Sequence, residues 1–120
     1  MTRTLAVKLT CGAEAAERAN QALTVAASAV ALGAPVSLWL TGEAVWFGVT
    51  GRIPDLGLDG AVDAVELIAT IREVGSISVC SQCAARRGVG DSDLIEGARI
   101  AGAAAFAELV LQDDVRALVY

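Results

Sequence analysis

Short apolar segments alternate with helix-like segments along this chain, and that alternation constrains the fold more than any other feature. Strand-like segments rich in Val, Leu and Ile cover residues 4–10, 36–40, 76–79, 98–101 and 116–120. Helical patterns fall between them, at residues 13–32, 41–47, 62–73, 81–87 and 102–112. Strands that alternate with helices usually pair in parallel. We therefore expect an α/β domain with a mostly parallel sheet covered on both faces.

The hydrophobic composition predicts a core of small side chains. Hydrophobic residues make up 55% of the 120 residues, whereas aromatic residues make up only 4%, so the core must be built from Ala, Val, Leu and Ile. A chain of this length buries roughly two-thirds of its unfolded surface, enough for one core without disulfides or a structural metal. We expect a single domain over residues 1–120.

Charge and hydropathy exclude two classes of partner. A formal charge of −5 argues against nucleic-acid binding, which depends on clustered Lys and Arg. The apolar run at residues 22–34 is too short to span a bilayer, so we expect no membrane partner. Residues 1–5 lead into the first strand without the apolar region of a secretory signal. We therefore expect a cytoplasmic protein.

The counts of cysteine and histidine limit the available chemistry. Three cysteines, an odd number, fit free thiols in a reducing compartment. Because the chain has no histidine, Cys-His proteases, Ser-His-Asp hydrolases and imidazole zinc sites are excluded. Gly97 and Gly102 lack the spacing of a dinucleotide site. We expect no metal and no cofactor, and a reactive cysteine here must be activated by backbone dipoles or by Lys and Arg.

Cys80 and Cys83 are the candidate catalytic residues. Cys80 stands where a buried strand hands over to a helix, and a helix start favours thiolate over thiol. We therefore expect Cys80 to be the more acidic thiol. Cys83 lies three residues further, on the same helical face, near enough for a disulfide or for exchange of a sulfur atom. The alternative is that these cysteines are small buried hydrophobes without chemistry.

Other residues are expected to line the same site. The carboxyl ends of parallel strands share one edge of the sheet, which would bring Cys11, Gly42 and Glu43 close to Cys80. Cys11 also fits a turn residue without chemistry. Arg86 and Arg87 are expected to interact with the dipole at the helix C-terminus, and one of them can reach an anionic sulfur group or a carboxylate of a partner. Arg86 is the one expected to line the site. The aromatic residues are expected in the core or at an interface between subunits, and they are Trp39, Trp46 and Phe47.

The run Cys80-Ser-Gln-Cys83-Ala-Ala-Arg86-Arg87-Gly88 resembles the cysteine segment of the DsrE/TusD-like sulfur-relay family, in which a cysteine precedes Arg-Arg-Gly by the same interval. The Ala-rich helix after the first strand and the stretches at residues 36–45 and 114–119 are also similar to that family. The resemblance places Cys80 at the persulfide-carrying position. Several members have alanine where this chain has Cys83, and other relatives have a Cys-x-x-Cys.

The resemblance implies a three-layer α/β/α sandwich with a five-stranded sheet, assembled into homotrimers or hexamers, including hetero-hexamers. It also implies a sulfur carrier or persulfide sulfurtransferase that takes sulfur from a donor protein onto Cys80 and passes it to the thiol of an acceptor protein. The second thiol leaves open a dithiol redox protein that uses Cys80 and Cys83 as a pair. A non-catalytic oligomeric scaffold with buried cysteines is the third alternative.

Overall fold

Five strands form one sheet in the computed structural model, which describes residues 3–120. The strands are β1 (Thr4–Leu9), β2 (Val36–Leu40), β3 (Ser76–Cys80), β4 (Ala98–Ala101) and β5 (Val115–Val119). They lie in the order β4-β3-β2-β1-β5, and every neighbouring pair is parallel. The expected five-stranded α/β architecture is confirmed, and within the described residues the sheet is parallel throughout.

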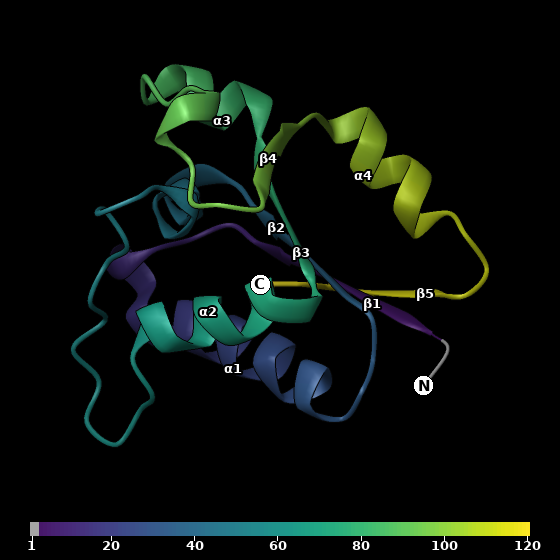
Figure 1. Ribbon diagram of the computed structural model, residues 1–120, viewed down its shortest axis with the longest axis horizontal. Coiled ribbons are helices and arrows are strands. Elements are labelled where there is room, and N and C mark those ends of the chain that lie inside the picture. Colours follow the sequence, from purple (N-terminus) through teal and green to yellow (C-terminus); the bar gives the residue numbers. More distant parts are fainter. Residues whose placement is uncertain (1–2) are drawn as a thin grey trace.

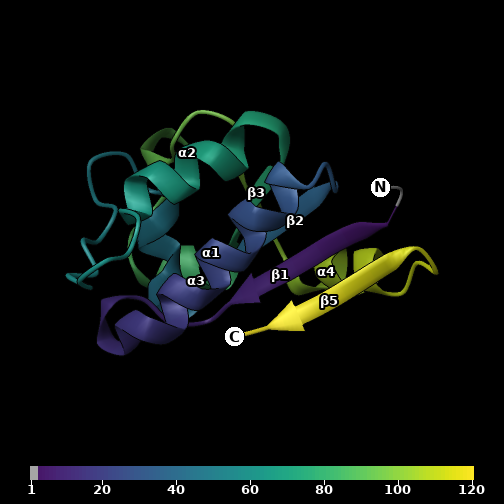
Figure 2. The same ribbon diagram turned by 90° about the horizontal axis from the view of Figure 1, so that it is seen from below.

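Helices cover the two faces of the sheet unequally (Figures 1 and 2). Helices α1 (Ala16–Ala31) and α2 (Ala64–Val74) lie together on one face, and α4 (Ala103–Val110) lies on the other. The short α3 (Ser81–Arg86) follows β3 directly at the carboxyl edge of the sheet. The three layers of an α/β/α sandwich are therefore present, with two helices in one outer layer and one in the other.

The main core lies between the sheet and the pair α1 and α2. Strand side chains that point to this side are buried, among them Val7, Leu38 and Val79. They meet small side chains of α1, such as Ala22 and Ala26, both with 0% exposure. Because alanine has no side chain beyond Cβ, α1 can approach the sheet closely. The expected core of small aliphatic residues is confirmed.

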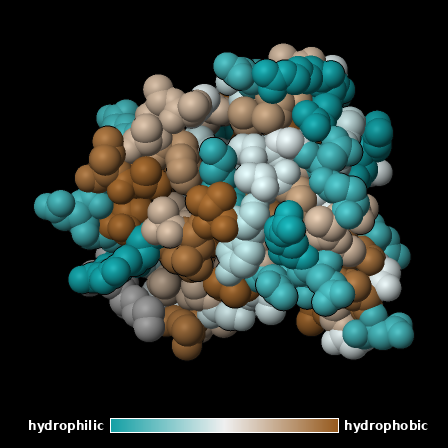
Figure 3. Space-filling view, turned by 180° about the vertical axis from the view of Figure 1, so that it is seen from behind, coloured by the Kyte–Doolittle hydropathy of each residue, from teal (hydrophilic) through white to brown (hydrophobic). Residues whose placement is uncertain are grey.

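The opposite face of the sheet is more polar and less covered. Trp39 donates a hydrogen bond from Nε1 to Ser37 Oγ (2.8 Å) and meets Phe106 of α4 edge-on, with ring centroids 5.2 Å apart. No residue of α4 itself is buried. Apolar side chains remain exposed nearby, including Leu111 (81%) and Val119 (65%), and Figure 3 shows an apolar surface on the side that carries α4 and β5.

Three segments that were expected to be α-helix or loop form 3₁₀ turns, namely η1 (Ala13–Ala15), η2 (Gly42–Gly48) and η3 (Asp91–Asp93). The helix expected from residue 13 therefore becomes α-helical only at Ala16. Its first turn is tightened because the Glu14 carboxylate accepts a hydrogen bond from the backbone N–H of Gly12 (2.6 Å). The Glu14 carboxylate thus binds the backbone that precedes its turn, and it also lies where the helix dipole favours a negative charge.

Candidate functional site

The turns that follow the strands meet at one edge of the sheet. Cys80 is the last residue of β3 and the cap residue of α3, and Gly42 begins the turn after β2. Cys11 and Gly12 follow β1, and Gly102 follows β4. All the strands are parallel, so these positions share the carboxyl edge, as expected from the sequence.

Glycine at two positions allows the turns after β1 and β2 to touch. Gly42 has φ +55°, and a Cβ there would lie 2.8 Å from the carbonyl oxygen of Thr10. A Cβ on Gly12 would lie 2.9 Å from the carbonyl oxygen of Glu43. No other residue type fits either contact without a shift of the backbone. The backbone of Gly42 is thus held in a fixed place beside α3.

Cys80 and Cys83 are free, half-buried thiols at this edge. The backbone N–H of Gly42 and the Cys80 side chain are close enough to favour the thiolate form of Cys83. Burial acts to raise the pKa of the Cys83 thiol, but these two groups and the charges of Arg86 and Arg87 outweigh it, so the pKa of Cys83 is lowered. The expectation that Cys80 is the more acidic thiol stays a prediction. The groups that favour a thiolate at Cys83 come from the turn after β2 and from α3.

Arg87 ties α3 to the turn after β2. Its Nε lies 2.8 Å from Glu43 Oε2 in an ion pair, and its guanidinium also donates to the carbonyl oxygen of Cys83 (3.1 Å). Arg86, the arginine expected to line the site, donates to Gln82 Oε1 at 3.3 Å and is exposed, although its charge also acts on Cys83. Of the two arginines considered from the sequence, Arg87 is the one that reaches Glu43. Its position four residues after Cys83, on the same helical face, was the available signal.

Cys11 lies at the same edge but points away from the thiol pair. Its side chain is 4% exposed, and its sulfur lies 3.9 Å from the carbonyl oxygen of Ala15. Burial, followed by the negative charge of Glu14, raises the pKa of the Cys11 thiol, with Arg18 acting in the opposite direction. Cys11 is therefore a core residue beneath its turn.

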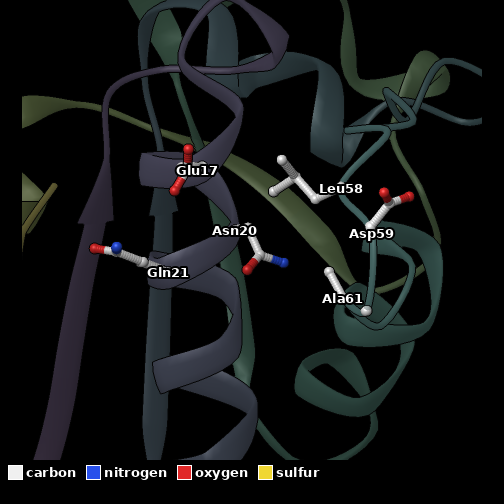
Figure 4. A pocket seen from close by; sticks show the side chains of 7 residues that line it. Glu17, Asn20, Gln21, Leu58, Asp59 and Ala61 are labelled. Atoms are coloured by element: carbon white, nitrogen blue, oxygen red, sulfur yellow. The ribbon is translucent and has the colours of Figure 1, made fainter.

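A groove of about 420 Å³ lies beside the turn after α3 and includes Arg87. Arg52 forms part of it and stacks over the Trp46 ring, with the guanidinium carbon 4.4 Å from the ring centroid. A second hollow, of about 400 Å³, lies between α1 and the loop near Leu58 (Figure 4). The second hollow contains no thiol and no arginine. No cysteine lines either hollow, but the groove includes Arg87, which pairs with Glu43 and donates to the Cys83 carbonyl oxygen.

Residues 3–120 contain neither a metal-binding cluster nor a membrane-spanning helix. No group of at least three His, Cys, Asp or Glu residues is placed to hold a metal ion in this part of the chain. Among the same residues, no helix has both the length and the apolar character required to cross a membrane.

The fold and the thiol pair define a class of parallel α/β proteins that present two cysteines at the carboxyl edge of the sheet. Within that class, the chain belongs to the DsrE/DsrF-like family, whose model matches residues 5–118. The family is generally associated with sulfur relay. The resemblance found in the cysteine segment is confirmed at the level of the family.

Three similar proteins place the chain among its relatives. Protein MK0008 of Methanopyrus kandleri is 33% identical over 86 residues, which cover 71% of this chain and 68% of that protein. The YchN protein of E. coli matches over 100% of both chains, with a TM-score of 0.81 and 20% identity. Protein MTH1491 of Methanobacterium thermoautotrophicum matches over 98% of this chain and 99% of its own, with a TM-score of 0.70 and 9% identity. The two structures share the fold with this chain.

Proposed function

We propose that this protein is a sulfur carrier that holds a persulfide on Cys80 and passes the terminal sulfur to an acceptor thiol. The observation that carries the proposal is the paired arrangement of two half-buried thiols beside the Gly42 N–H, at the shared edge of the sheet. The reaction needs a thiolate nucleophile, access for a partner and no metal. Membership of a family associated with sulfur relay supports the same reading.

The assignment of the stored sulfur to Cys80 has two supports. The motif Cys80-Ser-Gln-Cys83-Ala-Ala-Arg86-Arg87-Gly88 resembles the cysteine segment of the family, and this resemblance implies that Cys80 is the persulfide-carrying residue. Cys83, in contrast, has a lowered pKa, and a thiol of low pKa is a good leaving group in exchange reactions. Sulfur bound to Cys83 would therefore be displaced readily, so Cys80 is the better place to store it.

The partners follow from this chemistry. We propose a persulfide-bearing protein as donor and a thiol protein as acceptor, in the cytoplasm. We also propose a homo-oligomer, a trimer or a hexamer, but for a different reason from the one the sequence suggested. Trp39 (4% exposed) and Phe47 (0%) are buried inside the single chain, whereas Leu111 and Val119 leave apolar surface around α4 and β5. Sedimentation as a monomer at micromolar concentration would contradict the oligomer.

Intact-mass analysis after exposure to glutathione persulfide tests the carrier. The wild-type protein should gain one sulfur that a reductant removes. Cys80→Ser should retain no sulfur once the donor is removed, whereas Cys11→Ser, which changes a buried thiol outside the pair, should load like the wild type. Stable loading of Cys80→Ser would show that the stored sulfur is elsewhere.

A dithiol redox protein is the second candidate, and the proximity of two free thiols, Cys80 and Cys83, favours it. In this function the two thiols would close a disulfide and pass two electrons and two protons to a disulfide substrate. The same mass analysis separates the two functions. Loss of two hydrogens without gain of sulfur, and a requirement for Cys83 as strict as for Cys80, would favour the redox function.

A further inference from the structure

We propose that Cys83 is the entry thiol of this carrier, positioned by the Glu43–Arg87 ion pair, and that sulfur reaches Cys80 through it. The inference rests on the proposed function and adds a role for the second thiol. It turns on four residues from two different turns: Cys83 and Arg87 on α3 and its end, and Gly42 and Glu43 after β2.

The position of Cys83 is fixed from two sides. Arg87 donates to the carbonyl oxygen of Cys83 (3.1 Å) and pairs with Glu43 (2.8 Å), so one side chain fastens the cysteine's own helical turn to the neighbouring loop. That loop is itself fixed, because Glu43 backbone atoms lie against Gly12 and Gly42 lies against Thr10. Cys83 also packs on the edge of the hydrophobic core. The helical turn that carries Cys83 is therefore held against the loop that carries the Gly42 N–H.

This geometry suits a thiolate that attacks. A fixed N–H donor stabilises negative charge on sulfur without reorganisation, in the manner of an oxyanion hole. The titratable and charged groups that face Cys83 are Cys80, Arg86 and Arg87, with Glu43 acting through its ion pair. Their combined effect with the Gly42 N–H lowers the pKa of Cys83, in agreement with the geometry.

The sulfur moves in two balanced steps. The Cys83 thiolate first attacks the terminal sulfur of a donor persulfide, so that the new Cys83 S–S bond forms, the donor S–S bond breaks, and the donor leaves as a thiolate. Cys80 then gives its proton to water or to that thiolate and attacks the terminal sulfur on Cys83. The product is the Cys80 persulfide, and Cys83 returns to its thiolate. Neither step requires an oxidant or a reductant.

With two thiols, one residue can accept the incoming sulfur and another can store it. A stabilised thiolate is available for attack at neutral pH, and it also leaves easily once it carries sulfur. Cys83 therefore acquires sulfur quickly and does not keep it. Cys80, which ends β3 next to it, completes the transfer within the chain. Removal of Cys83 should slow loading without changing its final extent.

The test is a quenched time course of loading with glutathione persulfide, followed by intact-mass analysis. Relative to wild type, Cys83→Ser should load about tenfold more slowly near neutral pH, reach the same one sulfur, and require a higher pH for the same rate. Cys80→Ser should show sulfur that appears briefly and disappears on addition of a thiol. Cys11→Ser is the matched control and should follow the wild-type course.

The positioning role has its own comparison, between two adjacent arginines. Arg86→Gln and Arg87→Gln each remove one charge that acts on Cys83, but only Arg87 joins Glu43 to α3. Arg87→Gln and Glu43→Gln should slow loading by about threefold and shift its pH profile upward, more than Arg86→Gln does. Arg87→Lys should recover part of the loss, because it keeps the charge while losing the paired geometry.

The outcomes separate the two proposals. If Cys83→Ser loads as fast as wild type with an unchanged pH profile, Cys83 is not the entry thiol, while the Cys80 carrier stands. If Cys80→Ser keeps a stable sulfur, the storage site is wrong and the order of transfer fails with it. If the two arginine variants behave alike, charge alone explains the effect of Arg87, and the positioning role is overturned.

Discussion

Two turns at the same edge of the sheet carry cysteines, and their thiols have opposite properties. Cys11 follows β1 and Cys83 lies just after β3, yet the pKa of Cys11 is raised and that of Cys83 is lowered. Burial acts to raise both. The difference comes from the neighbours, because Cys11 has the carboxylate of Glu14 beside it, whereas Cys83 has a backbone N–H, a second thiol and two arginines.

The comparison shows that a place at the carboxyl edge does not make a cysteine reactive. The edge collects turns from several strands, and each turn decides whether its side chains point to solvent or into the core. The Cys11 sulfur is directed towards the start of α1, whereas Cys83 is directed towards the turn after β2. Of Cys11 and Cys83, only Cys83 has neighbours from a second turn that lower its pKa.

The largest expected difference is in alkylation. In the native protein at neutral pH, iodoacetamide should modify Cys11 roughly 100-fold more slowly than Cys83, because Cys11 must wait for local opening and its pKa is raised. Peptide mass mapping over time measures both sites in one sample. Denaturant should abolish most of the difference. Equal rates in the native state would mean that the turn after β1 opens freely, and the contrast between the turns would fail.

The second prediction breaks the contact that serves Cys83. Gly42→Ala should destabilise the protein by about 1–2 kcal/mol from its left-handed φ alone, and by more because its Cβ would overlap Thr10. It should also slow alkylation of Cys83 several-fold, since the N–H donor moves. Gly51→Ala is the matched control, with φ +72° and nothing within 4 Å of its Cβ. Thermal unfolding and alkylation measure the two effects.

Agreement between these two glycine variants would argue against the contact. If Gly42→Ala and Gly51→Ala lose the same stability and leave Cys83 equally reactive, the close approach of Gly42 to Thr10 contributes neither to stability nor to the reactivity of Cys83. If only the stability differs, the overlap is real but the N–H does not act on the thiol.

The sequence predicted the layers and the cysteine edge well, because both depend on local patterns. Buried segments such as residues 36–40 and 76–79 are strands in any compact α/β arrangement, and parallel pairing then places Cys80 and Gly42 at one edge. The chemistry of the edge depends on contacts between turns, which no local pattern contains. The Gly42 N–H at Cys83 and the Glu43–Arg87 pair join residues about forty positions apart.

The same reasoning explains why the surroundings of Cys83 were not predicted. A helix start next to Cys80 was visible in the sequence, and it favoured Cys80 as the acidic thiol. Visible only in the structure is that Cys83 turns back to the loop after β2 and gains several partners there. Arg86 and Arg87 were likewise indistinguishable in the sequence, although only Arg87 reaches Glu43.

A third prediction uses the pH dependence of stability. The folded-state pKa of Cys83 is lowered from its ordinary value of 9.0, so its thiolate stabilises the folded protein. That contribution is complete above the unfolded pKa and is lost as pH falls through the folded pKa. The stability difference between wild type and Cys83→Ser should therefore increase in favour of wild type from about pH 6 to about pH 9. Urea unfolding at each pH measures it, and a constant difference would contradict a lowered pKa.

The smallest expected effect is on the pKa of Cys11, through the negative charge of Glu14. Burial is the first cause of its raised pKa and the charge of Glu14 is the second, so Glu14→Gln should lower the Cys11 pKa without returning it to the ordinary value. Gln retains an oxygen to accept the hydrogen bond from Gly12, so the turn should be preserved. Glu17→Gln, an exposed change in the first turn of α1 that is not a cause of the shift, is the control. Ultraviolet titration of thiolate in a Cys80→Ser, Cys83→Ser background measures Cys11 alone.

The same substitution has an expected effect on stability. A raised folded-state pKa gives stability that disappears as pH rises through that pKa, so Glu14→Gln should reduce the loss of stability at alkaline pH. If Glu14→Gln and Glu17→Gln titrate alike, burial alone separates Cys11 from Cys83, and the neighbouring charge has no part in the difference.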